Sequence, residues 1–228
     1  TTIEAKSGYG LSTESEIRSL EAIQEVDASH AIDLVPTFLG AHEVPDEWRS
    51  DPDGYVRLLC DEMLPEVARR KLADACDVFC EKGVFSVDQS RRILARAKEL
   101  GLKVKLHADE IHPTGSAELA AEMGALSADH LVHVSEDGMR LMKERGVIPI
   151  LLPATSFFIK LTQDAPGAEA QDAGVVVPAA RDEETADDEE DDDRQAAPAV
   201  QPEERRLGAA GQGELVAVEH RERGHDAD

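Results

Sequence analysis

The first 160 residues alternate between short apolar runs and longer stretches with amphipathic helical spacing, and this alternation limits the folds open to the chain. Each apolar run has the length of a single buried strand. The helical stretches between the runs can carry the chain back to the start of the next strand. Short apolar strands that alternate with helices are typical of a parallel sheet covered by helices. We therefore expect an α/β protein.

The pattern predicts six strands joined by five helical crossovers. The strands are expected at residues 1–6, 32–38, 76–80, 102–107, 126–132 and 147–152. Helices are expected from residue 13, at 55–72, after Ser86, at 116–123 and at 136–145. Thr13-x-x-Glu16 and Ser86-x-x-Gln89 have capping-box spacing, and Pro65 either breaks a helix or starts a second one. A (β/α)8 barrel and an open doubly wound sheet both fit. No glycine-rich phosphate fingerprint follows a strand, which disfavours dinucleotide binding.

Residues 161–228 have a different composition. They carry 20 acidic residues against six arginines, contain no lysine or aromatic residue, and include an uninterrupted acidic run at 187–193. Such a segment buries too little apolar surface to offset its ordering entropy. We expect two regions: a partial barrel at 1–160 and an acidic low-complexity tail at 161–228. The tail is expected to be disordered or translated out of frame; a functional acidic interaction tail is the alternative.

The composition of the whole chain excludes several classes of partner. A formal net charge of -24 argues against nucleic acid and anionic membranes as partners. No apolar run approaches the roughly 20 residues of a membrane span. Three cysteines (Cys60, Cys76 and Cys80) form no even disulfide set, which favours a reducing, cytoplasmic location. The chain begins with Thr1 rather than Met, and we expect a truncated or processed polypeptide.

Histidines lie at the ends of three expected strands, where α/β proteins place reactive groups. His42, His107 and His130 have this placement. Polar residues alternate with apolar ones before His107, so its side chain should point away from the helices, and Asp109 shares its parity. Glu110 follows in the loop and could hold a substrate or a water molecule. A single histidine in such a place is more often a hydrogen-bonded structural residue; three favour a site.

Other residues leave both a functional and a structural interpretation open. Tyr9 lies between Gly8 and Gly10 in a strand-end turn, where it either donates to a ligand oxygen or is a surface residue. Cys76 and Cys80 share one face of a strand and are expected to be buried core thiols. The histidines and the carboxylate together favour water activated by Zn(II) or Fe(II) over covalent catalysis.

Six segments carry a family resemblance. They are residues 4–11 (EAKSGYGL), 36–42 (PTFLGAH), 78–85 (VFCEKGVF), 106–110 (LHADE), 127–133 (SADHLVH) and 153–158 (PATSFF). Residues 1–160 resemble the imidazolonepropionase family of the amidohydrolase superfamily. The resemblance implies a metal-dependent (β/α)8 TIM-type barrel with Zn or Fe. It also implies hydrolysis of 4-imidazolone-5-propanoate to N-formimidoyl-L-glutamate in histidine degradation.

The resemblance also implies roles for single residues. The family places an His-x-His on barrel strand 1, a third metal ligand on strand 5, a catalytic histidine on strand 6 and an aspartate ligand on strand 8. If residues 1–6 form strand 2, then His107 corresponds to the metal ligand and His130 to the catalytic histidine. Glu110 corresponds to the residue that contacts substrate and water, and Tyr9 and His42 to substrate-binding positions.

Two family motifs do not occur in this sequence. The His-x-His with its following arginine is absent, as is the expected Thr-Asp-Phe-Asn-Pro-Gly, and Asp182 is no match for its aspartate. We therefore expect a fragment that lacks the first and last barrel strands. Its partner is expected to be a small-molecule substrate, with a homodimer compatible with the sequence. Another cyclic-amide or deaminating amidohydrolase, and a catalytically inactive fragment or scaffold, remain alternatives.

Overall fold

Six parallel strands form a single sheet in sequence order, β1-β2-β3-β4-β5-β6. A computed structural model describes residues 2–159 and 165–166, all within the first of two units, Thr1–Ala180 and Arg181–Asp228. The strands are β1 (Thr2–Lys6), β2 (Asp33–Ala41), β3 (Ala75–Cys80), β4 (Lys103–Ala108), β5 (Ser127–His130) and β6 (Ile148–Ile150). Each strand pairs with the next one along the chain, without the order reversal of a doubly wound sheet. The expected partial barrel is confirmed.

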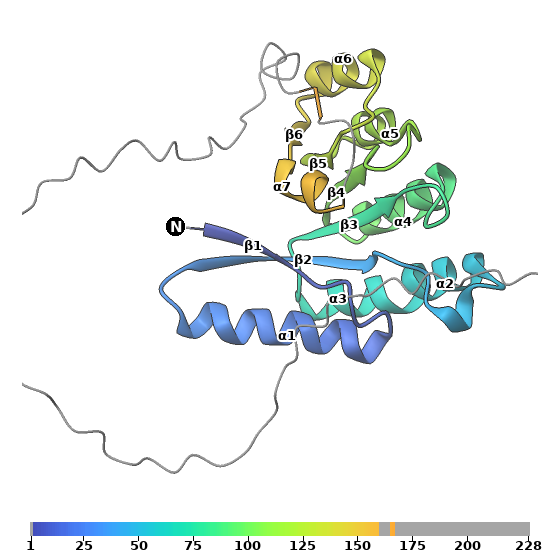
Figure 1. Cartoon of the computed structure of the whole chain (residues 1–228). Coiled ribbons are helices and arrows are strands. Elements are labelled where there is room, and N and C mark those ends of the chain that lie inside the picture. The colour runs from blue at the N-terminus through green and yellow to red at the C-terminus, as the bar shows by residue number, and fades with distance from the viewer. Residues whose placement is uncertain (1, 160–164, 167–228) are drawn as a thin grey trace, which may run out of the picture. The chain divides into compact units, whose positions relative to one another are not determined.

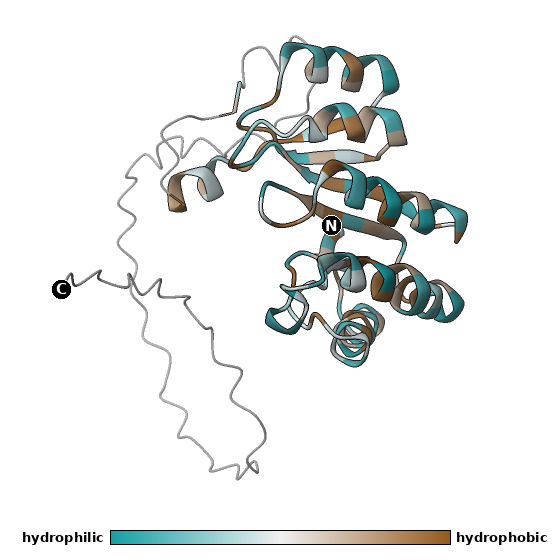
Figure 2. Cartoon of the chain, turned by 90° about the vertical axis from the view of Figure 1, so that its right-hand side faces the viewer, coloured by the Kyte–Doolittle hydropathy of each residue, from teal (hydrophilic) through white to brown (hydrophobic). Residues whose placement is uncertain are grey.

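Helices cover one face of this sheet, which curls as part of a barrel does (Figure 1). The elements are α1 (Thr13–Ser29), η1 (Asp46–Trp48), α2 (Pro52–Leu58), η2 (Leu59–Met63), α3 (Leu64–Arg70), α4 (Val87–Glu99), α5 (Ser116–Met123), α6 (Glu136–Arg145) and α7 (Pro153–Phe158). Hydrophilic and hydrophobic residues form separate stripes on the outer helices (Figure 2). These outer helices therefore have an apolar stripe to bury against the sheet.

The expected helix at 55–72 begins earlier and is continuous past Pro65. It runs from Pro52 to Arg70 through η2, a π-helical turn. A π turn widens the helix just before the proline, where an α-helix would need the missing backbone amide. Arg96 of α4 donates from Nε to the Cys60 carbonyl oxygen at 3.2 Å and satisfies a polar group in this turn.

The cap predicted for the first helix is wrong by one residue. Ser12 is the N-cap, and its side chain accepts from the Ser15 amide. Glu16 does not reach back to that cap; its Oε1 instead accepts the amides of Gly10 and Leu11 at 2.8 and 2.9 Å. Glu16 therefore fixes the loop that follows β1. The predicted capping box of α4 is confirmed.

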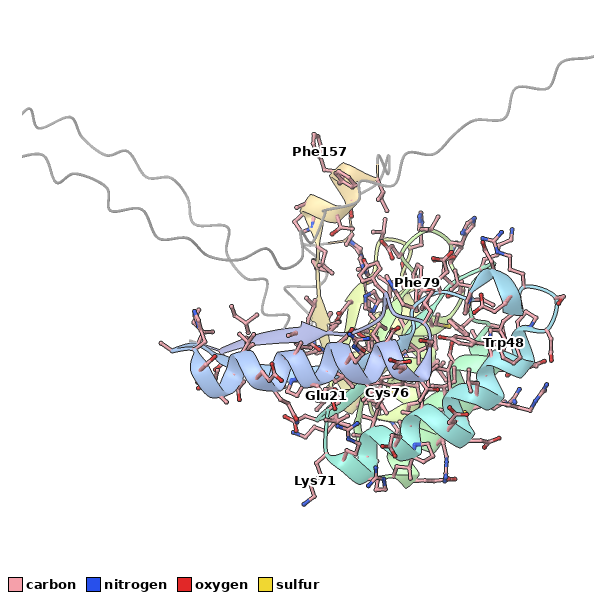
Figure 3. The ribbon with its side chains drawn as sticks, turned by 90° about the horizontal axis from the view of Figure 1, so that it is seen from below. Glu21, Trp48, Lys71, Cys76, Phe79 and Phe157 are labelled. Carbon is pink, nitrogen blue, oxygen red and sulfur yellow. The ribbon has the colours of Figure 1, made fainter. Side chains whose placement is uncertain are left out.

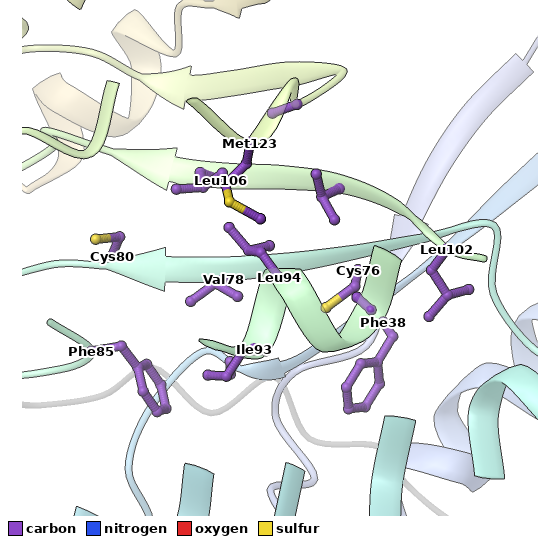
Figure 4. Packing of buried hydrophobic residues seen from close by; sticks show 14 of the residues in the cluster. Phe38, Cys76, Val78, Cys80, Phe85, Ile93, Leu94, Leu102, Leu106 and Met123 are labelled. Carbon is purple, nitrogen blue, oxygen red and sulfur yellow. The ribbon is translucent and has the colours of Figure 1, made fainter. Parts of the chain in front are cut away.

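The hydrophobic core lies between the sheet and the helices. Val78 and the two strand cysteines of β3 are buried there, against Ile93 and Leu94 of α4 (Figure 4). The thiols are free and buried, as the sequence predicted, and burial raises the pKa of Cys80 to about 11. Cys76 and Cys80 thus behave as small apolar side chains.

Within the described residues, no helix combines the length and the apolar character that a membrane crossing requires. The acidic tail predicted for residues 161–228 lies outside the described residues, apart from positions 165–166. Helix α7, which the sequence did not predict, carries Phe157, whose side chain is 86% exposed and projects away from the other helices (Figure 3).

Candidate active site

The five residues singled out from the sequence come together at the carboxyl ends of the strands. The ring centroids of Tyr9 and His42 are 4.9 Å apart, those of His42 and His107 6.0 Å, and those of His107 and His130 5.2 Å. Nδ1 of His130 lies 3.3 Å from Oε1 of Glu110. A chain of contacts therefore links residues from the ends of four of the six strands, β1, β2, β4 and β5.

Tyr9 is placed by a glycine turn that is joined to the next strand. Gly8 has a φ of 121°, and a Cβ atom there would lie 2.9 Å from the Leu39 carbonyl oxygen, so only glycine fits. The Gly8 carbonyl oxygen lies 3.2 Å from Nδ1 of His42. The Tyr9 side chain remains 88% exposed, with its ring edge against His42. The turn thus presents both side chains at one edge of the sheet.

Glu110 is held by its neighbours on both sides. Asp109, at a φ of 47°, turns its carboxylate to accept the amides of Thr114, Gly115 and Ala117 at the start of α5. Asp109 therefore does not share the direction of His107, contrary to the parity prediction, because the strand ends at Ala108.

On the other side of Glu110, buried Glu81 accepts the amides of Ile111 and His112 at 3.0 and 3.3 Å. Its other oxygen lies 2.9 Å from Nδ1 of His112. Glu81 therefore holds the loop that contains Glu110 in place.

His130 occupies a strained position at the end of β5. It has a φ of 75°, and Leu131 follows with a φ of 58°. Left-handed conformations of this kind cost about 1–3 kcal/mol per residue and concentrate at functional sites. Nδ1 of His130 is buried and has no hydrogen-bond partner among the described residues, because its approach to Glu110 is too poorly aligned for one.

Charged residues inside the curled sheet form a network below the histidines, which sequence reasoning missed. Lys6 Nζ lies 2.6 Å from Asp77 Oδ2 and 2.7 Å from Asp129 Oδ2. Asp77 also lies 3.1 Å from Nδ1 of His107. One signal was available: these charged residues interrupt strands that are otherwise apolar, and buried charges are rare unless they are paired.

The network sets the protonation of its members. Burial alone would raise the pKa of Asp77, but His107 and Lys6 hold it well below its usual range. Burial would lower the pKa values of Lys6 and His107, but the carboxylates beside them outweigh burial and raise both. Asp77 is therefore an anion at neutral pH and Lys6 a cation.

The pKa values of the groups above the network shift so that their neutral forms are favoured. Burial lowers the pKa of His130 to about 4, with a contribution from His107. Burial and His107 also lower the pKa of His42. Burial raises the pKa of Glu110, with Glu81 adding to the effect and His107 opposing it. His42 and His130 are thus neutral imidazoles at pH 7, and Glu110 accepts a proton more readily than an exposed glutamate.

One part of the site fits a metal ligand. Asp77 contacts Nδ1 of His107, so that Nε2 is the nitrogen that could bind a metal. Carboxylates commonly orient metal-binding imidazoles in this way. Donor atoms of Asp77, His107 and Asp129 also lie within 4.8 Å of one another. The ring of Phe79, labelled in Figure 3, lies beside His107, with 5.9 Å between the ring centroids. The Lys6 ammonium, however, already lies between the two carboxylates.

Solved structures share this fold. Guanine deaminase from C. acetobutylicum aligns with 78% of this chain and 45% of its own at a TM-score of 0.57, with 13% identity. Adenine deaminase from Arthrobacter aurescens covers 76% of this chain and 54% of its own at a TM-score of 0.54, with 17% identity. An amidohydrolase from Burkholderia ambifaria with bound Zn gives a TM-score of 0.54 at 14% identity, over 77% of this chain and 50% of its own.

Sequence comparison gives much nearer relatives, although no family model matches the chain. Imidazolonepropionase from Geobacillus kaustophilus is 58% identical over 182 residues, and that from Alkaliphilus metalliredigens is 53% identical over the same length. The alignments take in 80% of this chain but only 43% of each relative, so the chain spans less than half of their length. Over the aligned 182 residues, the chain is therefore similar to part of the proteins named imidazolonepropionase.

Proposed function

We propose that this chain is part of an imidazolonepropionase. It would carry the metal ligand His107 and the proton-transfer residues Glu110 and His130. The reaction is the hydrolysis of 4-imidazolone-5-propanoate to N-formimidoyl-L-glutamate in histidine degradation. The observation that carries the proposal is the chain of contacts from Tyr9 through His42 and His107 to His130 and Glu110. The 58% identity to a protein named for this activity supports it.

His107 would hold Zn or Fe through Nε2, because Asp77 occupies Nδ1. The remaining ligands would be the His-x-His and the aspartate that the family resemblance implies. When bound, the ion lowers the pKa of a water molecule and polarises the ring carbonyl. Asp77 fixes the tautomer of His107 and strengthens its imidazole as a donor.

Glu110 and His130 would move and hold the protons. Glu110 takes a proton from the attacking water and passes it to the ring nitrogen as the carbon–nitrogen bond breaks. The raised pKa of Glu110 suits this exchange. His130, neutral at pH 7 because its pKa is lowered to about 4, donates a hydrogen bond to the carbonyl oxygen as negative charge develops there.

Tyr9 and His42 would bind the substrate. The Tyr9 hydroxyl is exposed at the strand ends, and His42 lies between Tyr9 and His107. Both can hydrogen-bond the polar groups of a small cyclic amide with an acidic side chain. We further propose a cytoplasmic protein in which residues 1–160 form the barrel part and 161–228 a separate acidic tail. A homodimer also remains a proposal.

A chimera provides the test. Residues 2–159 of this chain would replace the corresponding segment of the Geobacillus kaustophilus relative, which supplies the remaining ligands. Loss of substrate absorbance at a rate near that of the parent relative would support the proposal. A folded, metal-loaded chimera that does not turn over the substrate would contradict it. Turnover of another cyclic amide or of an aminated ring would favour the deaminating or cyclic-amide alternative.

A further inference from the structure

Three donors from adjacent strands form a compact cluster inside the sheet. Asp77 of β3, His107 of β4 and Asp129 of β5 present ligand atoms within 4.8 Å of one another. Carboxylates combined with an imidazole are a common ligand set for divalent ions such as Zn(II), Mn(II) and Fe(II). By composition alone, this cluster is suited to a divalent cation.

Lys6 occupies that position. Its ammonium reaches one oxygen of each carboxylate, at 2.6 and 2.7 Å, which is the range of strong charge-assisted hydrogen bonds. Both carboxylates are almost fully buried, so water screens this pairing weakly. A divalent ion at the cluster would have to displace the ammonium or lie against it.

The other nearby cation is already engaged elsewhere. Lys105 Nζ pairs with Glu4, and the Thr37 hydroxyl donates to the same Glu4 carboxylate at 2.6 Å. Ser127 Oγ, 3.2 Å from Asp129 Oδ1, carries no charge. Without Lys6, Asp77 and Asp129 would therefore be buried next to each other without the ammonium that contacts both, and His107 would remain beside Asp77 as the nearest positive group.

We propose that Lys6 is a built-in cation that closes the Asp77–His107–Asp129 cluster to divalent ions. It holds Asp77 beside Nδ1 of His107, so that His107 can meet an ion only through Nε2. Lys6 is in this sense a positioning residue for His107. The exclusion of divalent ions from the cluster does not depend on the proposed hydrolysis. Only the binding of a catalytic metal ion by Nε2 of His107 rests on that proposed function.

The test is ion binding by the 228-residue chain, measured by calorimetry with Zn(II) and by the visible spectrum of Co(II). Lys6→Met should gain one bound ion, at least about tenfold tighter than any ion held by the parent chain, because two buried carboxylates lose their counter-charge. The gain should disappear in Lys6→Met/Asp129→Asn. Lys6→Arg is the matched control, since it keeps the cation and should keep the cluster closed.

Two outcomes overturn the proposal. One is a Lys6→Met chain that gains no ion. The other is a parent chain whose ion binding falls on Asp129→Asn, which would mean that the cluster itself takes the ion with Lys6 displaced. If Lys6→Met is unfolded, Zn(II) should restore its fold, and failure to do so counts against the proposal.

A measurement on the parent chain makes the test independent of that variant. The Lys6 ammonium should give an NMR signal protected from solvent exchange and unchanged as Zn(II) is added. Loss of that signal on titration would also overturn the proposal. An inactive chimera together with ion gain in Lys6→Met would remove the proposed function and leave the role of Lys6 standing.

Discussion

The Asp77 carboxylate lies 3.1 Å from Nδ1 of His107, on the neighbouring strand. The two residues are not opposite each other in the ladder, where Asp77 faces Lys105 and His107 faces Phe79. The contact is therefore diagonal across the inner face of the sheet, between side chains that point to the same side. The contact engages Nδ1 of the His107 imidazole and does not involve Nε2.

Asp77→Asn should weaken ion binding at His107. Asparagine has nearly the same shape, but it removes the charge that stabilises the tautomer with a proton on Nδ1. Loss of such a carboxylate typically lowers metal affinity by about 10–100-fold. Equilibrium dialysis of Zn(II) with the chimera measures the change, with Asp53→Asn, an exposed aspartate of α2, as control. Equal affinities of parent and Asp77→Asn would show that Asp77 does not support His107.

His130 should make the folded chain sensitive to mild acid. Its pKa is lowered from 6.5 to about 4 by burial and by His107, so the unfolded chain binds protons more readily over that interval. Above about pH 6.5, His130 is neutral in both states and does not lower the free energy of unfolding. As the pH falls from 6.5 towards 4, the free energy of unfolding should fall by roughly 3 kcal/mol. His130→Asn should lack this loss. Urea unfolding at pH 7 and pH 5 measures the difference, and identical pH dependence in both chains would contradict the prediction.

The sequence was sufficient to predict local structure wherever the signal was local. Helices α5 and α6 have their predicted bounds, and the cap of α4 follows from Ser86 and Gln89. Pro65 lies in the first turn of α3, as one of the two sequence alternatives expected, but the π turn before it depends on how the helix packs, which periodicity does not show.

Histidines at strand ends were likewise readable, because parallel strands must end at one edge of the sheet. The contacts among Lys6, Asp77 and Asp129 were not. Charged residues in apolar strands indicate that each is paired, but Asp77 and Asp129 are 71 and 123 residues from Lys6, and only the pairing of distant strands shows which charges meet.

Gly8→Ala should destabilise the turn that presents Tyr9. The new Cβ would lie 2.9 Å from the Leu39 carbonyl oxygen, and φ is 121°. A loss of about 1–3 kcal/mol in unfolding free energy is expected. Gly83→Ala is the matched control: its φ is 87°, but nothing lies within 4 Å of the added carbon, so only about 1 kcal/mol should be lost. Equal losses in urea unfolding would show that the contact with Leu39 has no effect.

His107→Ala and Glu110→Gln should separate ion binding from proton transfer in the chimera. His107→Ala removes an imidazole whose Nε2 is proposed to hold the ion, so both bound metal and turnover should fall. Glu110→Gln keeps the shape of the side chain and should keep the metal, but turnover should fall by about 10²–10⁴-fold. Metal analysis and turnover are measured on the same samples. If both variants bind metal like the parent, the proposed division of roles is wrong.

The 228-residue chain alone should not hydrolyse imidazolonepropionate. Of the family's expected ligands, His107 is the one that the described residues provide, and a catalytic zinc normally needs three protein ligands and one open position. The nearby carboxylates cannot complete the set, because Lys6 lies between them. The assay follows substrate absorbance with Zn(II) or Fe(II) added, and the active chimera is the positive control. Turnover near that of the chimera would mean that residues outside those described, or a second copy of the chain, supply the missing ligands. Mixing the inactive His107→Ala chain with the parent would then distinguish the two sources, because a shared site changes activity with the mixing ratio and a self-contained one does not.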